Sequence, residues 1–197
     1  MEQPIDNYSQ KLYFGKHLSK YTLLETNIWI NYKPNEMMQQ ENERKNGKRS
    51  GLWMRDKKIF EREKILSRFV AQEIIATYDD QNRYYEHTLH STYVQDKRFK
   101  IKYILGLYNS SLLKFYYQKT NSHGGNIFPQ IRISSLENLP IKVATTDFQD
   151  VIEKLVDKIL TAKKGDRHAD TSELEKECDR LIYKLYQLTY DEVKAIT

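Results

Sequence analysis

The chain has 197 residues, the size of one large domain or of one domain with an appendage. Its 39% apolar and 30% charged residues indicate a heavily solvated surface, and its net charge of +5 favours an anionic partner such as nucleic acid. The single cysteine, Cys178, excludes an internal disulfide and a cysteine-built metal site. No apolar run approaches the ~20 residues that cross a bilayer, and the first residues lack the apolar core of a signal peptide, so we expect an intracellular, cytoplasmic protein.

The first half of the chain predicts short strands and one long polar loop. Residues 28–32 are apolar and are followed by Pro34, which is typical of a short, mostly buried strand. Residues 35–51 have no apolar face, so we expect a mobile loop there. Residues 65–78 are rich in β-branched side chains and indicate one or two strands, and residues 84–94 indicate another. The turn-forming residues between them, 79–83, predict the tip of a hairpin.

Residues 101–141 predict a rigid base that presents a loop. Apolar side chains at steps of three and four predict a helix over residues 101–116. Residues 121–126 are polar and contain two glycines, which indicates a loop. Ile131 and Ile133 then alternate with Arg132, which predicts a short strand with Arg132 on its exposed face. The loop has the character of a recognition loop, although an ordinary helix–loop–strand connection explains the same pattern.

The last part of the chain predicts a helical arm. An apolar stripe over residues 148–160 marks one helix, for which Thr146 and Gln149 fit a capping box. A second helix begins at residue 170 or 171, with Glu173 placed to reach back to its cap, and the short connection between the helices predicts an antiparallel hairpin. Thr189 and Glu192 repeat the capping signature for a last short helix.

These elements together predict an α+β fold. Residues 1–143 would form a β-rich target-recognition platform with a packed central helix, and residues 144–197 would form the C-terminal antiparallel helical hairpin. The charges on the two arm helices balance, so they indicate a structural arm or a docking surface.

One basic run is the densest positive region of the chain. Only Asp56, Glu61 and Glu63 oppose its lysines and arginines. Clustered cations release counterions from a polyanion, so the run predicts contacts with phosphates, with a solvated surface loop as the alternative. Its basic residues are Arg44, Lys45, Lys48, Arg49, Arg55, Lys57, Lys58, Arg62, Lys64 and Arg68.

Signatures of catalysis are weak. There is no glycine-rich phosphate loop and no serine in a nucleophile elbow. His87 and His90 would point to opposite faces of a strand, which argues against a metal site. Asp56 and Glu192 each begin an acid-x-Lys fragment of the kind found in metal-dependent nucleases, but such a short pattern is common in charged chains.

Several blocks of the sequence, in order, carry a resemblance to a known family. FEREKILSRF, IIATYDD, YYEHTLHSTYV, KYILGLYNSSLLKFYY and FPQIRISSLENLPI resemble the TaqI-like C-terminal specificity domain. GKHLSKYTLLETNIWINY is similar to the opening segment of that family, and the arm is similar to the helices that follow such domains. The family is the target-recognition part of adenine-specific restriction-modification methyltransferases, including the fused type IIG restriction enzymes.

The resemblance implies a domain that reads bases of double-stranded DNA while a methyltransferase domain or subunit flips and methylates an adenine. This chain has no N/D-P-P-Y/F segment and no glycine-rich cofactor loop, so S-adenosylmethionine would bind the catalytic part of the parent enzyme. We expect no catalytic, cofactor-binding or metal-binding residues in the chain, which would be either an excised C-terminal portion or a separate subunit. Besides the basic run, the candidates for base or backbone contacts are Lys119, Asn121, His123, Asn126, Gln130 and Arg132.

A second hypothesis is a protein–protein interaction module. In that case the helical hairpin would dimerise or dock onto a catalytic subunit, and its apolar stripes predict an exposed apolar edge. An enzyme is the third hypothesis, and it requires acids clustered around Asp56 or Glu192.

Overall fold

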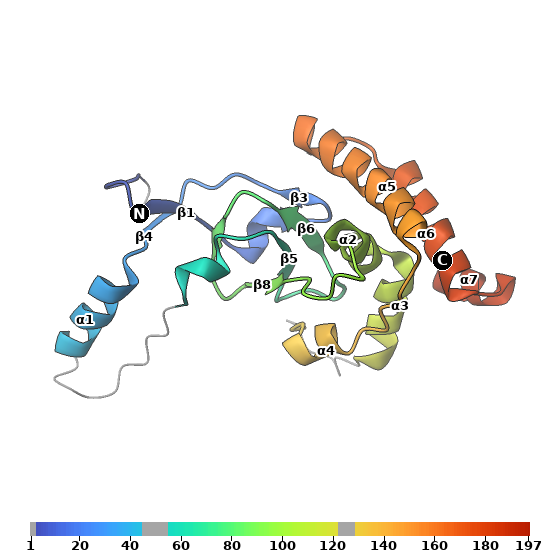
Figure 1. Cartoon of the computed structure of the whole chain (residues 1–197), viewed down its shortest axis with the longest axis horizontal. Helices are drawn as coiled ribbons and strands as arrows, with labels where there is room; N and C mark the ends of the chain where they lie inside the picture. Colours follow the sequence, from blue (N-terminus) through green and yellow to red (C-terminus); the bar gives the residue numbers. More distant parts are fainter. Residues whose placement is uncertain (1–2, 45–54, 122–128) are drawn as a thin grey trace.

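The fold is α+β, as the sequence predicted. The structure, a computed structural model, describes residues 3–44, 55–121 and 129–197, in which α-helices surround three small sheets (Figure 1). The strands are β1 Ser9–Tyr13, β2 Leu18–Ser19, β3 Thr22–Leu23, β4 Trp29–Asn31, β5 Lys64–Arg68, β6 Ala76–Asp79, β7 Tyr84–Tyr85 and β8 Leu89–Thr92. The helices are α1 Pro34–Arg44, α2 Ile101–Asn109, α3 Ser111–Thr120, α4 Ile133–Glu137, α5 Thr146–Gly165, α6 Ser172–Tyr186 and α7 Tyr190–Ile196, with 3-10 turns η1 Gly15–His17 and η2 Lys57–Ile59.

Strand β5 is the centre of the platform. It pairs antiparallel with β6 on one side and with β8 on the other. Ile65 belongs to the core formed with α2, α3 and α5, whereas Leu66 belongs to a second core of mostly aromatic residues around Tyr84. Because neighbouring side chains of a strand point to opposite faces, one strand separates the two cores.

The predicted hairpin with its tip at residues 79–83 is wrong. Strand β6 turns back onto β5, and β7 pairs in parallel with β1, so residues on either side of the expected tip belong to different sheets. The expected strand over residues 84–94 is also divided, into β7 and β8. Asp79 still accepts hydrogen bonds from Gln81 N and Arg83 N at the turn, but its carboxylate is buried against Lys64.

Two further predictions about the platform need correction. The helix expected over residues 101–116 is two helices, because Ser110 is extended and its side chain accepts a hydrogen bond from Leu113 N at 3.2 Å as the cap of α3. Part of the loop expected over residues 35–51 is helix α1, which begins at Pro34, a residue well suited to the first turn. Residues 45–51 of that loop lie outside the described residues.

The short strand expected around Arg132 is absent from the described residues of this segment. Only Gln130 forms an isolated bridge, with Val70, and helix α4 begins at Ile133. Ile131 is completely buried, whereas Ile133 is 58% exposed, so the two isoleucines do not share a face. Arg132 is exposed, as expected, but as the residue that precedes a helix.

The arm is a helical hairpin whose apolar stripes face the platform and each other. Ile152, Val156 and Ile159 of α5 join the core of α2, and α6 contributes Ile182 (Figure 1). Gly106 of α2 permits the close approach, since a Cβ there would lie 2.8 Å from Cγ2 of Ile152. The division of the chain at residues 143 and 144 stays a prediction, and the two parts share this core.

The predicted caps of the arm are partly right. The Thr189–Glu192 capping box of α7 is confirmed. The cap of α5 is Thr145 instead of Thr146, and Gln149 accepts a hydrogen bond from Lys100 N at 2.8 Å, which ties the arm to the platform. Thr171 precedes α6 but makes no side-chain capping bond, so Glu173 does not complete a box there. In the described residues, the helices are too short or too polar to cross a bilayer.

Candidate nucleic-acid interface

The predicted DNA-contacting residues fall into separate groups in the structure. Five of them lie outside the described residues: Lys45, Lys48, Arg49, His123 and Asn126. The others lie on α1, around η2, on β5, at the end of α3 and before α4.

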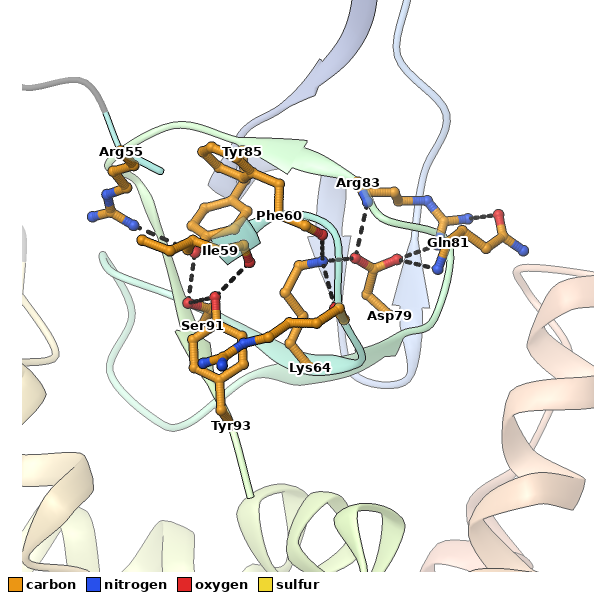
Figure 2. A network of polar contacts seen from close by, with 11 residues as sticks. Arg55, Ile59, Phe60, Lys64, Asp79, Gln81, Arg83, Tyr85, Ser91 and Tyr93 are labelled. Carbon is orange, nitrogen blue, oxygen red and sulfur yellow. Dashed lines mark hydrogen bonds and ion pairs between the residues drawn. The ribbon is translucent and has the colours of Figure 1, made fainter. Parts of the chain in front are cut away.

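Lys64 is a correction, because it does not face solvent. Its side chain is completely buried, and its Nζ lies 2.5 Å from Oδ2 of Asp79, whose side chain is buried as well (Figure 2). Nζ also donates to the backbone oxygens of Phe60 at 2.7 Å and Arg62 at 3.2 Å. A buried charge needs a partner, and Asp79 supplies it. Lys64 therefore stabilises the platform and cannot contact a phosphate in this arrangement.

Two other members of the basic run lie apart from its centre. Arg68 is half-buried, and its Nε donates to Leu18 O at 2.7 Å, which ties β5 to β2. Arg44 is at the end of α1, paired with Glu41 at 2.9 Å, and α1 projects away from the sheets (Figure 1). The run is therefore divided over several surfaces of the platform.

The exposed centre of the run is a group that we call the η2 patch: Arg55, Lys57, Lys58 and Arg62. Asp56 caps the turn by accepting a hydrogen bond from Lys58 N at 2.9 Å, which turns the lysine side chains outward. Lys57 forms an ion pair with Glu61 at 2.9 Å, and both side chains remain exposed. A surface pair of this kind is weak enough to exchange for a phosphate.

A chain of hydrogen bonds runs beneath the η2 patch (Figure 2). Arg55 Nη1 donates to the hydroxyl of Tyr85 at 3.3 Å, and that hydroxyl donates to Ser91 Oγ at 2.5 Å. Ser91 donates to the Tyr93 hydroxyl at 3.0 Å, and Tyr93 donates to Ile59 O at 2.7 Å. Burial raises the pKa of Tyr85 to about 12, so its hydroxyl keeps its proton at neutral pH. The chain joins η2 to strands β7 and β8.

Arg62 is held by an aromatic ring. Its guanidinium carbon lies 3.3 Å from the ring centroid of Tyr93, a cation–π contact of the closest kind. Tyr93, Tyr85 and Ser91 were not among the residues chosen from the sequence. The adjacent tyrosines Tyr84 and Tyr85 were the available signal, because such a pair can stack on bases, but at strand spacing it is more often part of the core.

A groove of about 300 Å³ extends from Arg55 along β8 to helix α4. Its lining is polar on the β8 side, with His90 to Tyr93, and includes Ile133 and Glu137 of α4. Backbone pairing holds α4 in place, since Ala71 N donates to Pro129 O at 3.0 Å and Ile131 N donates to Phe69 O at 2.7 Å. The groove thus brings the basic run and the segment around Arg132 to neighbouring parts of one surface.

The remaining candidates differ in their freedom to bind. Gln130 and Arg132 are exposed beside α4. Lys119 is exposed, with its Nζ 5.5 Å from the ring centroid of Phe115. Asn121 is half-buried, and its Oδ1 accepts a hydrogen bond from Ser135 at 2.7 Å, so it joins α3 to α4. Lys119 and Asn121 thus lie at the end of α3, and Arg132 lies just before α4, the helix that lines the groove opposite Arg55.

The acids and histidines considered for catalysis have structural contacts. Asp56 caps η2, Glu192 belongs to the capping box of α7, and His90 Nε2 lies 2.8 Å from Ile131 O. His87 is exposed and paired with Glu86. Within residues 3–44, 55–121 and 129–197, no three or more histidine, cysteine, aspartate or glutamate side chains form a group that could hold a metal ion.

Comparison with known proteins relates this surface to a family. Residues 10–141 match the TaqI-like C-terminal specificity domain. The match includes the η2 patch, the groove and helix α4. A search of curated proteins found no match to the chain.

Proposed function

The chain belongs to the TaqI-like C-terminal specificity domain family, the DNA-recognition part of restriction-modification methyltransferases, and we propose that it recognises a specific sequence of double-stranded DNA. In this proposal it has no catalytic activity of its own. It positions DNA for adenine methylation, and in a type IIG enzyme also for cleavage, by other domains or subunits.

The η2 patch beside the groove is the observation that carries the proposal. Four exposed cations lie around one capped turn, and the groove next to them offers hydroxyl, imidazole and carboxylate groups. Phosphate contacts position a protein on DNA, whereas polar groups that reach base edges supply specificity. Arg55 belongs to both the patch and the groove lining, so the two kinds of group adjoin each other. The patch residues are Arg55, Lys57, Lys58 and Arg62.

Methyl transfer belongs to a partner in this proposal. The sequence contains no N/D-P-P-Y/F segment and no glycine-rich loop, which are the parts that hold the flipped adenine and S-adenosylmethionine. The partner is a methyltransferase domain or subunit, and the free thiol of Cys178 fits a cytoplasmic location.

The alternative, an interaction module that docks through the helical hairpin, has less support from the packing. Ile152, Val156 and Ile159 are buried against the platform, so the stripe of α5 is not available to a partner. Exposed apolar side chains on the arm include Val151, at 45%, and Tyr190, at 81%, but they are on different helices. Scattered exposed apolar residues are normal on a monomer.

A salt titration of duplex binding tests the proposal. The full chain is mixed with fluorescent duplexes from the host genome, and the dissociation constant is measured from low to physiological salt. We expect the affinity to fall steeply as salt rises, because each phosphate contact releases about one counterion. The variant Arg55→Gln/Lys57→Gln/Lys58→Gln should reduce the slope of log affinity against log salt by roughly two to three.

A matched control removes the same charge from the arm. The variant Lys154→Gln/Lys158→Gln/Lys164→Gln changes three exposed lysines of α5, and it should leave the slope close to that of the unaltered chain. Equal slopes for all three proteins would place DNA binding elsewhere. Absence of duplex binding even at low salt would overturn the proposed function.

A further inference from the structure

We propose that Arg62 is a specificity-determining residue that reads a guanine base of the target sequence through the major groove. This inference rests on the proposed function and assigns one base contact within it. Guanine offers two acceptors, O6 and N7, to the major groove, and the planar fork of an arginine matches both.

The stacking of Arg62 on Tyr93 leaves that fork available. A cation–π contact uses the face of the guanidinium, whose carbon lies 3.3 Å from the ring centroid. The N–H groups lie in the plane of the guanidinium and point along its edge, so stacking does not consume them. Among the described residues, no acceptor forms a hydrogen bond with the side chain of Arg62, and this side chain is exposed.

Both ends of Arg62 are fixed by neighbouring groups. At the ring end, the Tyr93 hydroxyl donates to Ile59 O at 2.7 Å and accepts from Ser91 at 3.0 Å. At the backbone end, the buried ammonium of Lys64 donates to Arg62 O at 3.2 Å. A side chain that is ordered before binding loses less entropy when it binds, and it tolerates fewer orientations of its partner. This is the property that a base-reading residue needs.

The acids on either side of Arg62 in the sequence are engaged elsewhere. Glu61 pairs with Lys57 at 2.9 Å and accepts a hydrogen bond from Tyr84 at 3.2 Å. Glu63 accepts a hydrogen bond from the Tyr78 hydroxyl. Arg62 therefore keeps its charge and its donors, although two carboxylates are adjacent to it in the chain.

The exposed carboxylate of Glu63 favours a base over a phosphate as the ligand of Arg62. It would repel a phosphate close to Arg62, whereas the charge of Glu61 is paired with Lys57. Lys57 and Lys58, with compact ammonium groups on flexible four-carbon stems, suit phosphates better, because a point charge needs no fixed orientation. A guanine edge is uncharged, and hydrogen bonds to it require a donor with a fixed orientation.

The experiment uses the full chain and a duplex that it selects. Repeated selection from a library of random duplexes gives the preferred sequence. Each guanine in that sequence is then replaced, one at a time, by 7-deazaguanine, which removes the N7 acceptor and keeps Watson–Crick pairing. For the unaltered chain, we expect one position at which this change weakens binding by roughly tenfold.

The variant Arg62→Met identifies the residue responsible. It keeps an unbranched side chain of similar length but has no hydrogen-bond donor, so the same 7-deazaguanine duplex should cost it less than about twofold relative to guanine. Tyr93→Leu removes the aromatic ring on which Arg62 stacks. It should likewise reduce the difference in affinity between the guanine and 7-deazaguanine duplexes. Lys58→Gln is the control, which should bind all sequences more weakly and keep the full effect of 7-deazaguanine.

Three outcomes would overturn the inference while leaving the proposed function intact. One is an unchanged response to 7-deazaguanine in Arg62→Met and Tyr93→Leu. Another is a selected sequence in which no guanine is sensitive. The third is a reduced salt slope for Arg62→Gln with unchanged preference, which is the behaviour of a phosphate contact. Failure of selection to enrich any sequence would overturn both the inference and the proposed function.

Discussion

The ammonium of Lys64 lies 2.5 Å from the carboxylate of Asp79, and both side chains are completely buried. Asp79 is also 2.9 Å from Arg83 and accepts backbone hydrogen bonds from Gln81 and Arg83. Lys64 in turn binds the backbone oxygens of Phe60 and Arg62 (Figure 2). This network joins the start of β5 and the end of β6 to the segment that carries the η2 patch. Its effect on the η2 patch is therefore indirect.

Removing the ammonium should destabilise the whole platform. We expect Lys64→Met to lower the free energy of unfolding by about 3 kcal/mol, since the buried carboxylate of Asp79 loses its closest ion-pair partner and keeps only Arg83. Urea unfolding followed by circular dichroism measures the change. The double variant Lys64→Met/Asp79→Asn should recover part of the loss, because it removes the buried carboxylate charge but keeps a hydrogen-bond acceptor for Gln81 and Arg83.

Lys57→Met is the matched control for the same substitution in an exposed pair. Lys57 and Glu61 are 53% and 39% exposed, so the loss should stay below about 1 kcal/mol. If Lys64→Met were as mild as Lys57→Met, the buried pair would contribute nothing to stability.

Lys57 is exposed and Lys64 is buried, and this difference shows which features of the site can be predicted from the sequence. Both belong to one basic run, and charge density alone makes both candidates for phosphate contact. The partner that buries Lys64 is Asp79, which lies on another strand and looked like a turn residue. Pairing between distant segments decides which lysine is exposed, and this pairing cannot be predicted from the local sequence.

The same limit explains the errors in the fold. The β5 strand and the arm helices have strong local periodicity and were predicted. The parallel pairing of β1 with β7 was not predicted, because it joins residues far apart in the chain. Tyr93 was missed for a related reason, since its role depends on Arg62 and Ile59 from another segment. The family resemblance identified the domain but not the residues that read DNA, because readout changes with the target.

The close packing of α2 on α5 makes Gly106 sensitive to substitution. A Cβ at that position would lie 2.8 Å from Ile152 and 3.3 Å from Val156, both through Cγ2 of a branched side chain. We expect Gly106→Val to lower the free energy of unfolding by about 1–3 kcal/mol, since overpacking forces the helices apart. Thermal unfolding measures this change.

Lys154→Val on the exposed face of α5 controls for the helix propensity of valine, and it should cost less than about 0.7 kcal/mol. Should Gly106→Val prove no more harmful than Lys154→Val, the approach of the two helices would be looser than described.

The carboxylate of Asp179 connects the arm to the platform in a way that depends on pH. It accepts hydrogen bonds from Ser111 N at 2.9 Å and from Ser111 Oγ at 2.6 Å, at the start of α3. Burial raises the pKa of Asp179 above its ordinary value, against the lowering effect of the two Ser111 hydrogen bonds. The folded state therefore holds the proton at a pH at which the unfolded chain, with a pKa of about 3.9, has already released it.

The sign of the pH dependence follows from this difference in proton binding. As pH rises from about 4 through the folded pKa, the unfolded state becomes relatively more favourable, so the contribution of Asp179 to stability falls. In Asp179→Asn that loss should be absent, and the free energy of unfolding of the unaltered chain should decline relative to the variant over this range. Ser111→Ala removes one of the bonds that lower the pKa, so its decline should extend to higher pH. Urea unfolding at a series of pH values checks both variants, and parallel curves for the unaltered chain and Asp179→Asn would show that the Asp179 pKa is not raised on folding.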